Sequence, residues 1–413
     1  MTGAATSLDG LASARQERPG TLAEAAEVLR RAEKEKARVV FLGGGTELSL
    51  GAPPAGVEVV LGTERLERVV EHAPLDQIVT VEAGVRLASL QESLARSGQM
   101  LALDAPWAAR ATLGGLVATN AFGPRRTRFG SIRDLIIGIS IVRADGTEAR
   151  GGGKVVKNVA GFDLPKLMVG SLGTLGLIAT VTFRLHPLPE TQRTVLFADL
   201  DAEGVRRVVL ALRQAQLEPG AVAALVHEGG DDLGVRFDGR FELGVRFEGF
   251  EAGVRQQTEK LVELGTRQGW GAEPLGPDAA SAFWTRHDRA RESAAAFRAK
   301  LAAQPMELER VSNAALGSLF PVLEHPRAVC YPVLGLAFIS GDVRAAAPVV
   351  AAVNAAREAL PHGSVVLHAA PPEVRASVDV WGPPPAALPL MAQVKDRLDP
   401  GRRLAPGRFV GGL

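Results

Sequence analysis

Apolar residues occur along this chain in short blocks whose spacing changes between that of a helix and that of a strand. Thr21 and Glu24 form a predicted capping box, in which each side chain satisfies the other's free amide. The helix that follows has one apolar face, made of Leu22, Ala25, Ala26, Leu29 and Ala32. A second helix is predicted where leucines recur at helical spacing before Gly98, at Leu87, Leu90 and Leu94. Strands are predicted over residues 38–42, 57–61, 68–71, 77–82, 135–142 and 177–185.

The pattern changes after a linker that contains Pro187, Pro189 and Glu190. Beyond it we predict helices over 202–214 and 251–268, and strands over 195–200, near Val222, Val235 and Leu243, and over 333–339. This order predicts a β-rich sheet with helices on one face. Prolines at 371–372 and 383–385 then interrupt the predicted helices and strands. We therefore expect a flexible lead over 1–18, one domain over 19–188, a second over 189–372, and a C-terminal segment over 373–413.

Glycines recur in a pattern that neither helix nor strand requires. They cluster in three places, residues 43–45, residues 114–123 and residues 170–176. Glycine admits positive φ and lets backbone approach a ligand closely, and successive amides in such loops form concave sites for phosphate. Several such loops spread over roughly 130 residues indicate one large phosphate-bearing cofactor held at many points.

Two common glycine motifs are excluded. A Walker loop requires Lys followed by Ser or Thr, but Gly153-Lys154 is followed by Val155. A Rossmann fingerprint requires G-x-G-x-x-G, and the loop that starts at Gly43 has Leu48 at its sixth position. The cofactor is therefore bound by another geometry.

The glycine segments, taken together with residues 38–51, 106–130 and 154–178, resemble the FAD-binding domain of the vanillyl-alcohol oxidase (PCMH-type) flavoprotein family. Within that family, residues 151–167 and 118–135 are similar to the FAD-binding E subunits of bacterial glycolate oxidases. The resemblance implies an α+β fold: a PCMH-type FAD-binding domain of two subdomains with FAD between them, then an α/β cap domain. Residues 399–408 resemble the family's closing segment, which returns to the flavin domain; Ala405 stands where the family usually has Asn.

The resemblance also implies the FAD-binding residues, one by one. They are Leu42, Gly43, Gly44, Gly45, Thr46, Glu47, Leu48, Pro106, Thr112, Gly114, Gly115, Thr119, Asn120, Gly123, Gly173, Thr174, Gly176 and Ile178. Thr112 is also the expected N-cap of a helix, and a helix N-terminus is a place where an anion can bind. Relatives that tether FAD covalently have His where Thr46 stands, so FAD is expected to be non-covalent here.

Arginines cluster beside Asn120, and two of them, Arg125 and Arg126, are candidates for the carboxylate of a substrate, because Arg binds carboxylates in a bidentate fork. A solvated surface is the alternative, since Arg is mostly exposed. Lys154, Lys157 and Asn158 are interpreted in the same way. The seven His are dispersed, with His362 and His368 the nearest pair, so we predict no metal site and assign no catalytic residue.

Composition limits the classes of function. The chain has 413 residues, enough for two or three domains, and a net charge of +1 gives no reason to invoke nucleic acid. Its single cysteine, Cys330, excludes an iron–sulfur cluster within the chain, which needs about four thiolates. Residues 1–20 lack the apolar core of a signal peptide, and no run approaches the ~18 apolar residues of a membrane span. We expect a cytoplasmic protein, at most peripheral to the inner membrane.

The resemblance implies the FAD-binding subunit of a glycolate oxidase complex, which oxidises a small 2-hydroxy acid such as glycolate. A second FAD-containing catalytic subunit and an iron–sulfur subunit are implied as partners. Three alternatives stay open: a self-sufficient hydroxy-acid dehydrogenase, a non-catalytic FAD-bearing assembly subunit, and a UDP-sugar reductase with this FAD domain.

Overall fold

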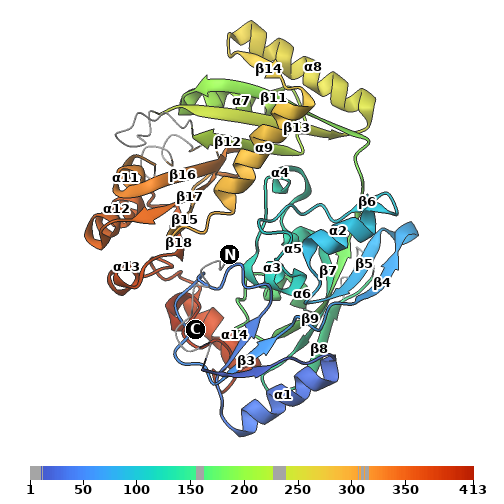
Figure 1. Ribbon diagram of the computed structural model, residues 1–413, viewed down its shortest axis with the longest axis vertical. Helices are drawn as coiled ribbons and strands as arrows, with labels where there is room; N and C mark the ends of the chain where they lie inside the picture. The colour runs from blue at the N-terminus through green and yellow to red at the C-terminus, as the bar shows by residue number, and fades with distance from the viewer. Residues whose placement is uncertain are drawn as a thin grey trace. The chain divides into compact units, whose positions relative to one another are not determined.

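The computed structural model describes residues 11, 13–154, 162–226, 239–305, 307, 311 and 316–413. The chain divides into two compact units, which we treat separately. Unit 1 comprises Met1–Gly123, Phe129–Leu188 and Pro384–Leu413, and unit 2 comprises Pro124–Arg128 and Pro189–Pro383. Figure 1 shows the elements of both units, coloured along the chain.

Unit 1 begins with a small parallel sheet in the order β1-β3-β2, made of β1 (Arg15–Glu17), β2 (Val39–Leu42) and β3 (Val59–Gly62). Helix α1 (Leu22–Lys34) buries its apolar face against β2 and β3. Its cap differs from the predicted box: Glu24 N donates to Thr21 Oγ1 at 3.2 Å, but the Glu24 carboxylate accepts from Gly20 N at 2.7 Å. The carboxylate thus satisfies the amide one residue before the predicted one.

The second sheet of unit 1 is antiparallel, in the order β4-β5-β9-β7-β8. Its strands are β4 (Val69–Ala73), β5 (Ile78–Glu82), β7 (Ile136–Val142), β8 (Glu148–Gly152) and β9 (Leu177–Arg184). A two-stranded pair joins β6 (Gln99–Met100) to β10 (His186–Pro187). The short helices near this sheet are α2 (Leu87–Ala95), α3 (Leu113–Thr119), α5 (Ile132–Leu135) and α6 (Leu164–Met168). Helix α4 (Arg126–Phe129) lies where the chain passes between the units.

The last part of the chain belongs to unit 1 and not to the unit that precedes it in sequence. Helix α14 (Leu388–Leu398) and the following residues 399–408 run back to β2. We call α14 and these residues together the tail. There Val39 N donates to the Arg403 carbonyl and Ala405 N donates to the Val39 carbonyl, both at 2.8 Å. Leu404 is fully buried in the core formed by α1 and β2.

Unit 2 is built on one antiparallel sheet in the order β14-β11-β13-β12-β16-β17-β15-β18. Its strands are β11 (Thr191–Leu200), β12 (Ala221–Val226), β13 (Phe241–Gly249), β14 (Ala272–Pro274), β15 (Phe297–Ala302), β16 (Leu323–Tyr331), β17 (Leu336–Val343) and β18 (Ser364–Ala369). Its helices include α7 (Ala202–Gln214), α8 (Glu251–Gln268), α9 (Pro277–Arg291), α11 (Gly317–Leu319), α12 (Ala346–Ala359) and α13 (Pro372–Ser377).

Helices cover both faces of this sheet, so the expectation of helices on one face was wrong. Helix α8 packs on the face that carries Phe197, because a Cβ at Gly265 would lie 3.0 Å from that ring. Helix α9 packs on the opposite face, where its Phe283 lies against Gly244. Gly244 follows Leu243 directly in β13. Phe197 pairs with Leu243 across β11 and β13, and successive residues of a strand point to opposite faces. The missing side chain at Gly244 thus makes room for α9 on the second face.

The predicted α+β fold class is confirmed. Helices α7 and α8 have the predicted bounds, whereas the strand predicted over 333–339 begins at Leu336, because Pro332–Leu334 forms a 3-10 turn. In unit 2 the strands β14, β15, β16 and β18 were not predicted, and in unit 1 the strands β1, β6, β8 and β10 were not predicted. Strand β1 lies within the lead that was expected to be flexible. The strand predicted near Val235 lies outside the described residues. Across the described part of the chain, no helix combines the length and apolar character that crossing a membrane requires.

Cys330 lies fully buried on β16, and burial raises the pKa of its thiol to about 12. The thiolate is the reactive form of cysteine, so we expect the folded protein to resist a disulfide-exchange reagent at pH 8 and to react once unfolded.

An unfolded cysteine ionises near pH 8.5, so the unfolded state binds fewer protons than the folded state above that pH. The free energy of unfolding should then fall with rising pH, by up to about 1.4 kcal/mol per unit more than in Cys330→Ala. Rapid labelling of the folded protein, or equal slopes for the two proteins, would contradict this.

Candidate functional site

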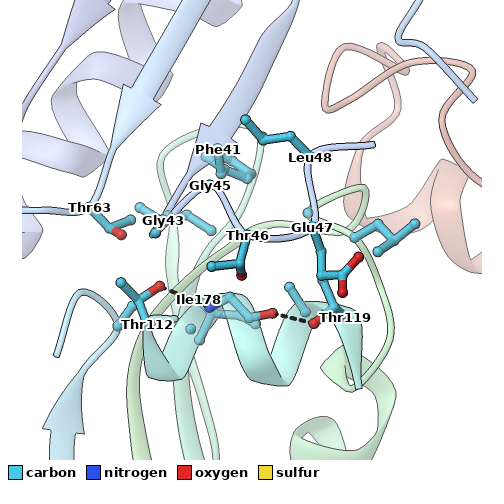
Figure 2. A pocket seen from close by; sticks show the side chains of 18 of the residues that line it. Phe41, Gly43, Gly45, Thr46, Glu47, Leu48, Thr63, Thr112, Thr119 and Ile178 are labelled. Carbon is cyan, nitrogen blue, oxygen red and sulfur yellow. Dashed lines mark hydrogen bonds between the residues drawn. The ribbon is translucent and has the colours of Figure 1, made fainter. Parts of the chain in front are cut away.

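A pocket opens in unit 1 between its two sheets, where segments from four parts of the chain meet. Figure 2 shows its lining side chains. The lining residues are Phe41, Gly43, Gly44, Gly45, Thr46, Glu47, Leu48, Thr63, Ala83, Thr112, Gly114, Gly115, Ala118, Thr119, Leu172, Gly173, Gly176, Leu177, Ile178 and Arg408. The pocket thus joins the loop after β2, helix α3, the loop before β9 and the tail.

The loop after β2 presents open backbone donors to the pocket. Gly45 has φ +70°, which turns the chain back, and the amides of Gly44, Gly45 and Thr46 donate to no other group in the described part of the chain. Consecutive amides around a residue of positive φ form a concave anion site. Gly44 itself lies against the backbone of residue 110, so a Cβ there would overlap the Arg110 carbonyl oxygen. This loop can therefore hold phosphate oxygens only while residue 44 has no side chain.

Helix α3 begins at the expected cap, but its first amides are already used. Thr112 Oγ1 accepts from Gly115 N at 3.4 Å, while Leu113 N and Gly114 N donate to the carbonyls of Val85 and Ala83 at 2.8 Å. These bonds fix the start of α3 to the end of β5 and leave the amides of Leu113, Gly114 and Gly115 committed to protein acceptors. The start of α3 therefore shapes the pocket wall, and the expected anion site at this terminus is not supported.

The other end of α3 holds the loop before β9. A helix ends with carbonyls that have no partner inside it. Here Val117 O accepts from Gly170 N and Ala118 O accepts from Leu172 N, each at 2.9 Å. Gly173 follows with φ +75°, and a Cβ added to it would stand 3.0 Å from the Phe41 ring. The loop is thereby held against both α3 and β2.

Arg408 of the tail lines the pocket and was not among the predicted residues. Its Nη2 donates to the carbonyls of Glu47 and Leu48, at 3.2 and 2.9 Å. It therefore supports the outer half of the loop after β2 and brings a positive charge to the pocket. The resemblance of residues 399–408 to a closing segment was the available signal, but it did not point to this residue. Other unpredicted lining residues are Phe41, Thr63, Ala83, Ala118, Leu172 and Leu177.

Of the predicted FAD-binding residues, five do not line the pocket: Leu42, Pro106, Asn120, Gly123 and Thr174. Leu42 ends β2, and Asn120 is the C-cap of α3 with φ 51°. A Cβ at Gly123 would overlap the Asp104 carbonyl oxygen, so this glycine serves a close backbone contact. Lys154 forms an ion pair with Glu71, and Lys157 and Asn158 lie outside the described residues.

Arg125, predicted to bind substrate, is used inside unit 2. Its Nη2 lies 3.0 Å from a carboxylate oxygen of Glu248, and its Nε lies 3.2 Å from the other oxygen. Glu248 is buried on β13, and a buried carboxylate is costly unless it is paired. The fork of Arg125 therefore neutralises Glu248. Arg126 lies next to it at the start of α4.

Unit 2 also contains a buried polar network that the dispersed histidines did not reveal. His287 on α9 is 2.9 Å from the Tyr331 hydroxyl through Nε2, and 2.9 Å from an Asp288 oxygen through Nδ1. Arg291 Nε donates to the same hydroxyl at 3.2 Å. The network joins α9 to β16 and has the residue types of an acid–base relay. Within the described ranges no three His, Cys, Asp or Glu residues group as metal ligands.

A family model described as "FAD binding domain" matches residues 16–152. This stretch contains the loop after β2 and helix α3, so the pocket lies largely within an FAD-binding domain.

Curated relatives match only part of this chain. "Glycolate oxidase subunit GlcE" of Escherichia coli (strain K12) is 36% identical over 164 residues, which is 40% of this chain and 46% of that protein. "D-2-hydroxyglutarate dehydrogenase" of Xanthomonas citri pv. viticola is 35% identical over 199 residues, 48% of this chain and 42% of that protein. "Glycolate oxidase subunit GlcD" of Bacillus subtilis (strain 168) is 30% identical over 207 residues, which is 50% of this chain and 44% of that protein. The chain spans less than half the length of each of these relatives.

Solved structures resemble the chain over most of its length. The structure of p-cresol methylhydroxylase with substrate bound has a TM-score of 0.75 at 15% identity and covers 95% of this chain and 88% of that one. A structure of alkyldihydroxyacetonephosphate synthase has a TM-score of 0.71 at 15% identity, and the match covers 95% of this chain and 77% of that one. At these identities the likeness establishes the fold alone.

We predict that Gly44→Ala lowers FAD occupancy at least tenfold, because the new Cβ overlaps the Arg110 carbonyl and displaces the open amides. The measurement is the yellow colour released to the supernatant when purified protein is precipitated with acid, which also tests non-covalent binding.

Gly253→Ala is the matched control, since Gly253 lies in α8 with nothing within 4 Å of an added Cβ. That variant should keep full occupancy and gain about 0.5–1 kcal/mol in the helix. Full occupancy in Gly44→Ala would remove this loop from the cofactor site, and flavin retained in the wild-type pellet would contradict non-covalent binding.

Proposed function

We propose that this chain is the FAD-binding subunit of a glycolate oxidase-type complex, which oxidises glycolate or a similar small 2-hydroxy acid to the 2-oxo acid. The observation that carries the proposal is the pocket itself. Its open amides and most of its glycines lie within residues 16–152, which match an FAD-binding domain. Parts of the chain are also similar to a glycolate oxidase subunit and to a hydroxy-acid dehydrogenase.

The pocket residues suit FAD held without a covalent bond. The amides of residues 44–46 would donate to the pyrophosphate, and Arg408 would add a compensating positive charge beside them. Thr46 offers no imidazole for attachment, and Cys330 lies in the sheet of unit 2. Bound FAD would supply the hydride acceptor, while the protein supplies binding, orientation and electrostatics.

A set of half-buried cations in unit 2 suits a carboxylate substrate. Arg298 and Lys300 lie two residues apart on β15 and thus on one face of the sheet. Arg375 is placed beside them, where its Nε donates to the Ala370 carbonyl at 2.8 Å. Burial lowers the pKa of Arg375, and the nearby charge of Arg298 lowers it further. A guanidinium binds a carboxylate in a bidentate fork, so this cation set is a candidate site for the carboxylate of a 2-hydroxy acid.

The proposal includes partners, because a flavin dehydrogenase must pass its electrons on. The chain has a single cysteine, too few for an iron–sulfur cluster. We therefore propose an iron–sulfur subunit and a second FAD-containing subunit as partners in a cytoplasmic complex, whose contact with the inner membrane is at most peripheral. Two of the relatives, GlcE and GlcD, are subunits of glycolate oxidase, and this supports a multi-subunit assembly.

A second candidate is a self-sufficient FAD-dependent hydroxy-acid dehydrogenase. The contact of His287 and Arg291 with the Tyr331 hydroxyl favours it, because oxidation of an alcohol by a flavin needs a base for the hydroxyl proton. The Tyr331 side chain is fully buried in this network, which favours a structural role and keeps the subunit proposal first.

We predict that the FAD-loaded chain alone is bleached slowly or not at all by glycolate or D-lactate under anaerobic conditions. Adding the partner subunits should produce rapid, saturable bleaching, measured by stopped-flow absorbance in the visible flavin band. Rapid bleaching of the lone chain, lost in Tyr331→Phe, would favour the self-sufficient dehydrogenase. Absence of bleaching in both preparations with every 2-hydroxy acid tried would overturn the oxidase proposal.

In whichever preparation reacts, Arg298→Gln should raise the apparent Kd for glycolate roughly ten- to a hundredfold, since a hydrogen bond to a charged group is lost. Flavin content and the reduction rate at saturating glycolate should change little. The control is Arg344→Gln, which removes an exposed guanidinium of unit 2 that pairs with Glu324. Equal Kd values for the two variants would remove the cation set from the substrate site.

A further inference from the structure

We propose that Lys395 is a positioning residue for the pocket: by holding the loop 170–176 through its Thr174 carbonyl, it sets the affinity of this chain for FAD. The inference rests on FAD as the occupant of the pocket, and it gives the tail a role that the glycine loops alone do not explain.

Lys395 is a buried ammonium whose three donors are all used inside unit 1. Its Nζ lies 2.7 Å from the Thr174 carbonyl, 2.7 Å from Asp399 Oδ2 and 2.9 Å from the Leu404 carbonyl. Both charged side chains are almost fully buried, at 2% exposure for Lys395 and 0% for Asp399. An ammonium has three protons, so the geometry satisfies it completely.

One of these three bonds differs from the other two in what it connects. The bonds to Asp399 and Leu404 close the tail on itself, over four and nine residues of sequence. The bond to Thr174 reaches 221 residues back, into the loop whose neighbours Leu172, Gly173 and Gly176 line the pocket. The third bond is therefore the one through which Lys395 acts on the loop.

The same tail reaches the facing wall of the pocket. Arg408 donates to the carbonyls of Glu47 and Leu48 in the loop after β2, and Ala405 N donates to the carbonyl of Val39, the first residue of β2. The tail is thus bonded to two pocket loops that are far apart in sequence. Because each loop is held by backbone carbonyls, it is held in one position whatever its side chains are.

Burial lowers the pKa of Lys395, and its hydrogen bond with Asp399 opposes that shift. Removing only one member of a buried pair leaves an uncompensated charge, whereas removing both charges is often close to neutral for stability. This difference allows the effect on the loop to be separated from the effect on folding.

The first test is the double variant Lys395→Met with Asp399→Asn, compared with Asp396→Asn. The double variant keeps an acceptor for Leu404 N but loses the donor to Thr174. Asp396 is the adjacent residue of α14 and forms an exposed pair with Arg402, so it is the matched control. We expect a thermal unfolding midpoint near that of wild type and FAD binding weakened roughly ten- to a hundredfold, measured by fluorescence titration of the apoprotein. Wild-type affinity in a folded double variant would overturn the proposal, whereas a wild-type protein that binds no FAD would overturn the cofactor assignment instead.

A second test needs no substitution and stands even where the variant fails to fold. Coupling between two sites is reciprocal, so FAD must stabilise the tail if the tail stabilises the FAD site. Hydrogen exchange of the wild-type protein should therefore show slower exchange at the amides of Asp399, Leu404 and Ala405 when FAD is bound. Helix α1 (Leu22–Lys34), whose residues do not line the pocket, is the internal reference. Equal exchange at the tail in the presence and absence of FAD would overturn the proposal.

Discussion

The pocket of unit 1 depends on the hydrogen bonds at the two ends of one short helix, α3. Its first amides donate to the carbonyls of Val85 and Ala83, and its last carbonyls accept from Gly170 and Leu172. A helix of seven residues has more unpaired backbone groups at its ends than hydrogen bonds inside it, so its position is decided by what those ends contact. Backbone groups therefore fix α3 to the end of β5 and to the loop before β9, and Gly114 and Gly173 allow the close contacts that this requires.

In the described residues, buried charged side chains form ion pairs that hold segments in place, and few of them line the pocket. The buried carboxylate of Glu248 is neutralised by Arg125, and the buried ammonium of Lys395 by Asp399. Each such pair stabilises a particular arrangement more than it stabilises the fold, because desolvation offsets much of the attraction. In unit 1 the arrangement is the position of a loop. In unit 2 it is the placement of residues 124–128 on β13.

Much of unit 1 could be predicted from sequence, because its strands and helices have clear periodicity and its glycine loops stand out from it. The glycines that line the pocket belong to the predicted set, and α7 and α8 of unit 2 were predicted to the residue. Strands β15, β16 and β18 were missed because Lys300, Arg327 and His368 interrupt their apolar runs. Arg408 and Lys395 could not be assigned either, since their roles come from contacts with carbonyls more than 200 residues away. Every residue has a backbone carbonyl whatever its side chain, so a contact with a carbonyl cannot be predicted from the residue types in the sequence.

Unit 1 is discontinuous along the chain, and this affects when it can be completed during synthesis. Pro189–Pro383, 195 residues by their numbers, separate most of unit 1 from its tail. At ribosomal rates of roughly 5–20 residues per second, those residues take on the order of 10 to 40 s to make. Throughout that interval β2 has no partner for the edge later taken by residues 403–405, and the site of Leu404 in the core is open. The nascent chain thus exposes an unfinished strand edge and an unfilled apolar site until unit 2 has emerged, which makes this interval the stage of its production most open to aggregation and to chaperone binding.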